Sequence, residues 1–123
     1  MKSLARNLGV FAAHSERRYA KEASEQLLEL FWREQREHPD LRGRPLYQAV
    51  IARRIGSNPA ISAAEIVRRA EESFADWPVE REVTFRDVVH YQIFDEYTRH
   101  GEVLHGTRTN IGDAVARVVP EDL

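Results

Sequence analysis

Apolar side chains recur at steps of three and four residues along most of the chain, which is the spacing of helices and not of strands. The clearest stretch covers residues 15–38, where charged side chains occupy the opposite positions. Its apolar members are Ala20, Ala23, Leu27, Leu30 and Phe31. Pro39 ends the stretch, because the residue before a proline is pushed out of the helical conformation. We therefore predict a long amphipathic helix over residues 15–38.

A second long helix is predicted over residues 85–100. A ladder of apolar residues at steps of four runs along it: Phe85, Val89, Ile93 and Tyr97. Further apolar residues fill much of the remaining circumference, which is typical of a central, buried helix. Thr84 and Asp87 have the spacing of a capping box at its start, and Gly101 is suited to its end.

Shorter helices are predicted around these two. The segments are 45–55, 62–76 and a final helix capped by Asn110, with a brief helix near residues 4–11. The connection before residue 84 alternates apolar and polar positions too briefly for a strand. The pattern thus predicts one all-α domain over residues 1–123, a compact bundle of about five to six helices of which 15–38 and 85–100 are the longest.

Composition narrows the functional classes. Lys and Arg number 18 against 20 Asp and Glu, so the formal charge is 18 − 20 = −2, which argues against a protein that coats nucleic acid or anionic membranes. No cysteine is present, which excludes thiolate metal sites and fits a reducing compartment. No apolar run approaches the roughly 20 residues of a membrane span. We expect a cytoplasmic protein with no membrane association and no cofactor.

One partial motif points to DNA. Gln48, Ala52 and Gly56 follow one another at steps of four and resemble the first half of the bacterial helix-turn-helix. The resemblance implies that residues 62–69 would enter the major groove. The arginines that would contact bases or phosphates are Arg53, Arg54, Arg68 and Arg69.

The chain also departs from that motif. The family has an apolar residue six places after the glycine, where this chain has Ser62, and Pro59 lengthens the turn. Ser62 and Glu65 instead match a capping box. Arg68 has the spacing to pair with Glu65 or Glu72 on its own helix, and these carboxylates would repel phosphate. DNA binding is therefore an alternative and not the favoured interpretation.

Two Glu-x-x-x-His pairs suggest a metal. Glu34 with His38, and Glu96 with His100, stand at the ends of the two long predicted helices, and a spacing of four puts both groups on one face. Two such helix ends meeting would offer four ligands. The ordinary interpretation is a surface contact, since carboxylate-bridged metal bundles use a spacing of three.

A third candidate is an anion site in the loop before the last helix. Thr107, Arg108 and Thr109 offer hydroxyls and a guanidinium at a helix start. Because the segment lacks the glycine spacing of a phosphate-binding loop, capping and loop closure are favoured over ligand binding.

The leading hypothesis is a non-enzymatic interaction or regulatory module, most simply a homodimer. Leu28 and Trp32 make the apolar arc of helix 15–38 wider than packing against one neighbouring helix requires. Tyr91 and Tyr97 do the same for helix 85–100. A domain of this size hides only about two-thirds of its unfolded surface, which leaves apolar area for a partner. A helix-turn-helix regulator and a small metal-dependent enzyme remain the alternatives.

Overall fold

The computed structural model describes residues 2–56, 62–73, 82–100 and 106–123. Every regular element in these ranges is a helix, which confirms the all-α prediction. The helices are α1 (Lys2–Glu37), α2 (Gly43–Ile55), α3 (Ala63–Ser73), α4 (Phe85–His100) and α5 (Thr107–Val118).

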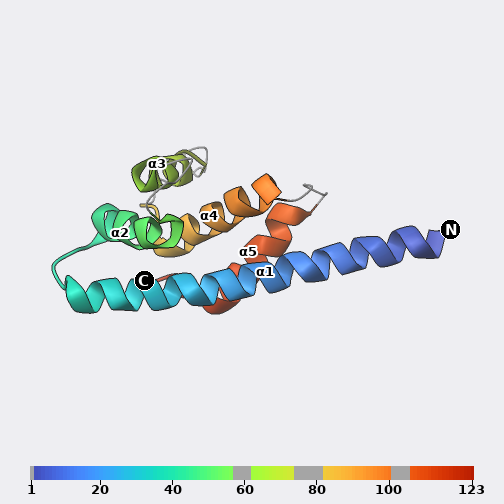
Figure 1. Ribbon diagram of the computed structural model, residues 1–123, viewed down its shortest axis with the longest axis horizontal. Helices are drawn as coiled ribbons and strands as arrows, with labels where there is room; N and C mark the ends of the chain where they lie inside the picture. Colours follow the sequence, from blue (N-terminus) through green and yellow to red (C-terminus); the bar gives the residue numbers. More distant parts are fainter. Residues whose placement is uncertain (1, 57–61, 74–81, 101–105) are drawn as a thin grey trace.

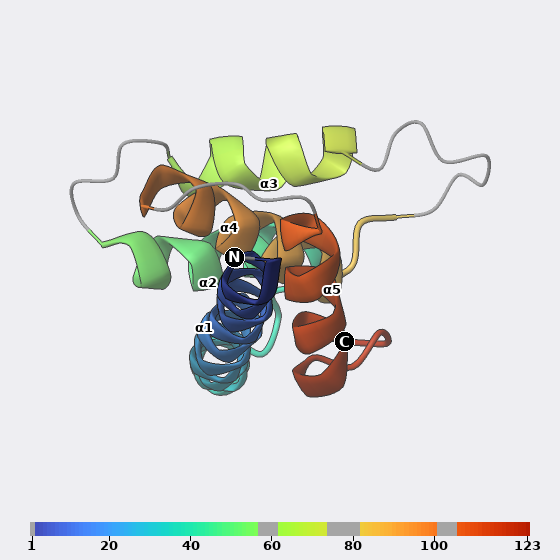
Figure 2. The same ribbon diagram turned by 90° about the vertical axis from the view of Figure 1, so that its right-hand side faces the viewer.

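The helices stack in three tiers (Figure 1; Figure 2). The lowest tier holds α1 and α5, the middle tier α2 and α4, and the top tier α3. α1 packs against α2, α4 and α5, whereas α3 contacts only α2 and α4. α1 is thus the helix against which α2, α4 and α5 pack.

The core lies where α1, α2 and α4 meet. The rings of Phe31 and Phe85 lie 4.5 Å apart, and Tyr47 stacks on Phe85 at 5.8 Å. The four residues expected to anchor the interior are all buried: Leu27, Phe31, Val89 and Ile93. Their burial confirms that the apolar faces of the two long helices share one interior.

Caps explain several helix starts. Thr84 and Asp87 form the predicted reciprocal box, with each backbone N–H donating to the other side chain at 3.1 and 3.2 Å. At α3 only half of the predicted box forms, because the Ser62 hydroxyl accepts from the Glu65 N–H at 3.2 Å. The Glu65 carboxylate is drawn instead to Arg68 and Arg69.

Two helices begin earlier than predicted. The brief N-terminal helix and helix 15–38 are one continuous helix, because the polar residues from His14 onward interrupt the apolar rhythm without breaking the backbone. α5 begins at Thr107 and not after Asn110, since Gly106 makes the turn with φ of 92°, a conformation that glycine adopts without strain.

The N-terminal part of α1 runs well past the other helices (Figure 1). At 1.5 Å per residue a helix of 36 residues is ~54 Å long, longer than any other element by far. In the part of the chain that the structure describes, no helix combines the length and apolar character needed to cross a bilayer.

Candidate functional site

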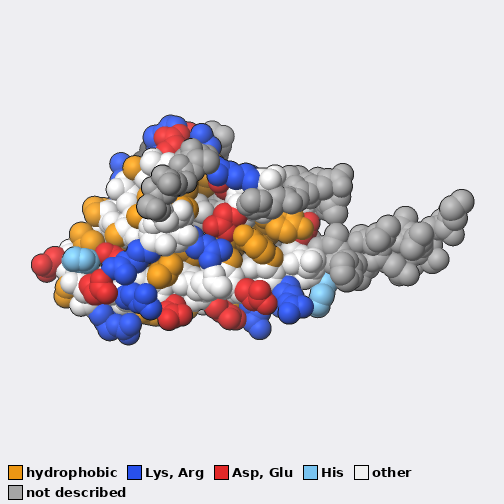
Figure 3. Space-filling view, in the orientation of Figure 1, with side chains coloured by type: hydrophobic (Ala, Val, Ile, Leu, Met, Phe, Trp, Pro, Cys, Tyr) orange, Lys and Arg blue, Asp and Glu red, His pale blue; other side chains and the backbone are white. Residues whose placement is uncertain are grey.

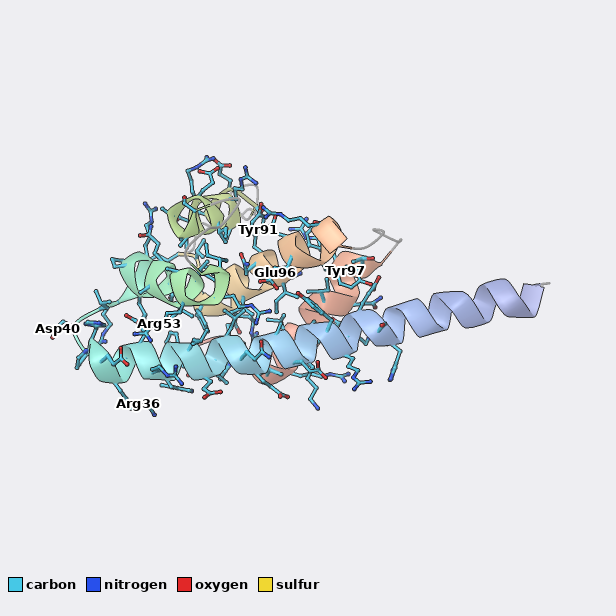
Figure 4. The ribbon with its side chains drawn as sticks, viewed as in Figure 1. Arg36, Asp40, Arg53, Tyr91, Glu96 and Tyr97 are labelled. Atoms are coloured by element: carbon cyan, nitrogen blue, oxygen red, sulfur yellow. The ribbon has the colours of Figure 1, made fainter. Side chains whose placement is uncertain are left out.

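The carboxylate of Glu96 on α4 is the meeting point of three helices. Arg54 of α2 donates two hydrogen bonds to this carboxylate, Nε to Oε1 at 3.1 Å and Nη2 to Oε2 at 3.0 Å. The Tyr19 hydroxyl of α1 donates to Oε2 at 2.8 Å, and Gln92 Nε2 donates to Oε1 at 2.8 Å. Figure 4 shows Glu96 between α4 and α1. We call these four residues the Glu96 cluster.

Electrostatics keep the Glu96 cluster charge-balanced. Burial by itself would raise the pKa of Glu96, but the hydrogen bonds from Arg54, Gln92 and Tyr19 outweigh it and hold that pKa below its usual value. Because four donors occupy both carboxylate oxygens, Glu96 is poorly placed to act as a general base. The cluster instead ties α1, α2 and α4 together.

Tyr19 should resist ionisation. Burial, reinforced by the hydrogen bond to Glu96, raises its pKa from 10.0 to about 12. The folded state therefore holds this proton more tightly than the unfolded state, so its contribution to stability is lost as pH rises above 10.0. A phenolate absorbance titration of wild type against Tyr19→Phe should assign the last folded-state transition to Tyr19. A Tyr19 transition near 10 in the folded protein would contradict the Glu96 cluster.

Arg53 makes a second junction between α2 and α1. Its guanidinium contacts Glu34 and Glu37, and Glu34 is only 4% exposed. His38 Nε2 lies 3.7 Å from Glu34, as the predicted spacing requires. Arg53 thus holds two carboxylates of the last turn of α1. Figure 4 shows Arg53 between α2 and α1.

Both carboxylates of the predicted four-ligand metal site are paired with arginines. Glu34 is engaged by Arg53, and Glu96 by Arg54, so each carboxylate has a cationic partner from α2. Among the side chains that are described, no group of three His, Asp or Glu residues is placed to hold a metal ion. The side chain of His100 lies outside the described part, so its role stays a prediction.

The arginines of the predicted DNA interface also form ion pairs with carboxylates of the chain. On α3, Arg68 pairs with Glu65 and Glu72, and Arg69 pairs with Glu65 at 3.1 Å. The hydrogen bonds from Arg68 and then Arg69 lower the pKa of Glu65 to about 2. Acidic and basic side chains also intermingle on the visible face of the molecule (Figure 3). Each of the four arginines predicted to contact DNA is therefore paired with a carboxylate: Arg53, Arg54, Arg68 and Arg69.

The predicted anion position at the start of α5 holds a carboxylate of the chain itself. Thr107 Oγ1 donates to Glu16 Oε1 at 2.7 Å, and Asn110 Nδ2 donates to Oε2 at 2.9 Å. Glu16 belongs to α1 and is 1% exposed. The positive end of α5 thus receives an internal anion. Arg108 and Thr109 remain exposed.

Sequence reasoning missed Glu16 and Arg54 as partners. The signal for Glu16 was the break in the apolar rhythm after His14, which puts a carboxylate on the inner face of a helix. Arg54 gave no such signal, because the pair it forms with Glu96 joins positions 42 residues apart. Arg99, on the same helix as Glu96, pairs with Asp95 at 3.0 Å.

Two residues of the predicted partner interface lie together on α1, and the other two lie at different places on α4. Trp32 is 44% exposed, with its ring edge-on to Phe31 at 5.2 Å, and Leu28 is half-buried one turn earlier on α1. On α4, Tyr91 lies toward α3, whereas Tyr97 lies above α1 near the point where α1 leaves the bundle (Figure 4). Tyr97 is edge-on to Tyr19 at 5.8 Å.

Comparison of the chain with models of known protein families, with curated proteins and with solved structures finds no match.

Proposed function

We propose that the protein is a non-enzymatic helical interaction module that pairs with a second copy through the N-terminal arm of α1, residues 2–13. The observation that carries the proposal is the course of this arm. Its backbone is helical from Lys2, and it extends past all four other helices with none of them alongside (Figure 1).

A helical arm of this length needs a stabilising contact. Isolated helices shorter than about 12 to 15 residues are marginal in water, and most helical stability in proteins comes from packing an amphipathic face. In the sequence, Leu4, Leu8 and Phe11 follow at steps of four and three, which is one stripe of a helix. A partner helix would supply the packing that the four other described helices do not.

The sequence of the arm favours a second copy as that partner. In an antiparallel pair centred on Leu8, Leu4 faces Ala12 of the other copy and Phe11 faces Ala5, so each large residue meets a small one. Alternating large and small residues across a helix pair gives dense packing, and a two-fold axis repeats each contact. At the base of the arm, the half-buried pair of Tyr19 and Tyr97 would continue this apolar surface.

Other observations support this class over the two alternatives. The two carboxylates of the predicted metal site form ion pairs within the chain, Glu96 with Arg54 and Glu34 with Arg53. The arginines proposed for DNA are likewise paired with carboxylates. The lack of cysteine fits a module that acts in the cytoplasm.

Sedimentation velocity of the full chain over micromolar concentrations tests the proposal. Wild type should sediment as a dimer, and Leu8→Glu should weaken association by about 30-fold or more, because a charge would be buried at the centre of the pair. Val10→Glu, which lies off the sequence stripe of Leu4, Leu8 and Phe11, is the matched control and should remain dimeric. Circular dichroism should show helicity falling on dilution in wild type.

Two results would overturn the proposal. One is a monomeric wild type throughout the concentration range, and the other is a Leu8→Glu variant that associates as tightly as Val10→Glu. A monomer that gains helix only on anionic vesicles would assign the arm to a membrane surface instead.

A further inference from the structure

A surface pocket of about 110 Å³ is lined by residues of α3, α4 and α5, and none of the lining residues that are described belongs to α1. It is lined by Ser73, His90, Tyr91, Phe94 and Arg108. Three of these five side chains, His90, Tyr91 and Phe94, are aromatic rings of α4. The pocket therefore presents flat, partly apolar walls with a guanidinium beside them.

The guanidinium is available to a ligand. Arg108 is exposed, and within the described ranges it makes no ion pair, unlike Arg53, Arg54, Arg68 and Arg69. The nearby Arg69 is already paired with Glu65. An arginine that pairs with none of the described carboxylates, next to aromatic walls, is suited to bind the carboxylate of a ligand through two parallel hydrogen bonds.

His90 is held in one position at this pocket. Its Nε2 lies 3.1 Å from the backbone oxygen of Arg108, and because a carbonyl only accepts, the neutral ring must donate from Nε2. Gly112 of α5 lies directly against the ring, since a Cβ there would be 2.9 Å from His90 Cε1. Burial lowers the pKa of His90, opposed in part by the Arg108 carbonyl, Asp87 and Asp113. A neutral, fixed imidazole is a stacking surface and not a second cation.

We propose that this pocket binds a small aromatic carboxylate, with the ring between His90, Tyr91 and Phe94 and the carboxylate on Arg108. The size sets the ligand class. A cavity of about 150 Å³ accommodates benzene, so a pocket of about 110 Å³ suits a single ring that partly protrudes toward solvent. Offset or edge-on stacking and one charge-assisted pair would supply the affinity.

Titration of the full chain with sodium benzoate, followed by ¹H–¹⁵N and aromatic NMR spectra, tests the proposal. Saturable shifts are expected around His90, Phe94 and Arg108. Benzyl alcohol, which keeps the ring and lacks the charge, should bind at least about tenfold more weakly. Arg108→Gln should weaken benzoate binding by a similar factor, whereas Arg117→Gln, an exposed arginine on the same helix, should leave it unchanged.

A second variant separates ring stacking from charge. Gly112→Ala must displace the His90 ring, so it should weaken benzoate and benzyl alcohol together, while Arg108→Gln affects benzoate alone. The proposal is overturned if benzoate shifts do not saturate, if benzyl alcohol binds as well as benzoate, or if Arg108→Gln and Arg117→Gln bind equally. None of these results depends on the association state of the arm.

Discussion

Replacing Arg54 with methionine is expected to lower the free energy of unfolding by about 2 to 3 kcal/mol at neutral pH. The substitution keeps the apolar stem but leaves the Glu96 carboxylate with only the neutral donors Tyr19 and Gln92. Because the Arg54 and Glu96 side chains retain 19% and 20% exposure, solvent screens part of the penalty. Urea denaturation followed by circular dichroism measures the loss.

The charge of Glu96 should be responsible for that loss. Without Arg54, burial is no longer outweighed and the pKa of Glu96 rises, so the gap between Arg54→Met and wild type should narrow as pH falls and the carboxylate is protonated. Adding Glu96→Gln should restore much of the stability at pH 7. Gln92 Oε1, which is buried with no hydrogen-bond partner among the described residues, would then accept from the new amide.

Arg36→Met is the matched control for this series. Arg36 is exposed near the end of α1 and extends away from the bundle (Figure 4), so its loss should change stability by no more than about 0.5 kcal/mol. Equal effects of Arg54→Met and Arg36→Met would show that the Glu96 cluster does not tie the helices together.

Glu16→Ala is expected to cost about 2 to 3 kcal/mol, because the carboxylate is fully buried and receives bonds from two side chains of α5. Its removal also takes a negative charge from the positive end of that helix. Beyond the global loss, amide hydrogen exchange should speed up in the first turn of α5, from Thr107 to Ile111. Glu16→Gln should lose less, since the amide oxygen still accepts one of the bonds.

Glu22→Ala provides the comparison on the same helix. Glu22 is exposed, and its partner among the described residues is the exposed Arg18 at 3.3 Å, so its removal should cost no more than about 0.5 kcal/mol. If both alanine variants were equally stable, or if exchange in α5 were unchanged in Glu16→Ala, then the contact between α1 and α5 would not depend on this carboxylate.

Local signals predicted the helices well because their causes are local. The step-of-four ladder and the Thr84–Asp87 box located the start of α4 at Phe85, since both act within one or two turns. The same logic failed at the start of α5. Asn110 looked like a cap, but its side chain donates to Glu16, 94 residues away, and Gly106 makes the turn instead.

The sequence by itself determined the all-helical class, the faces that form the core and the polarity of the surface, because apolar periodicity, caps and breakers operate between neighbouring residues. Only the tertiary structure decided which charges meet. Arg54 reaches Glu96, Arg53 reaches Glu34, and Glu16 reaches α5, while Arg108 is left beside the aromatic pocket. These pairings depend on how whole helices pack, because packing decides which of the many charged side chains become buried next to one another.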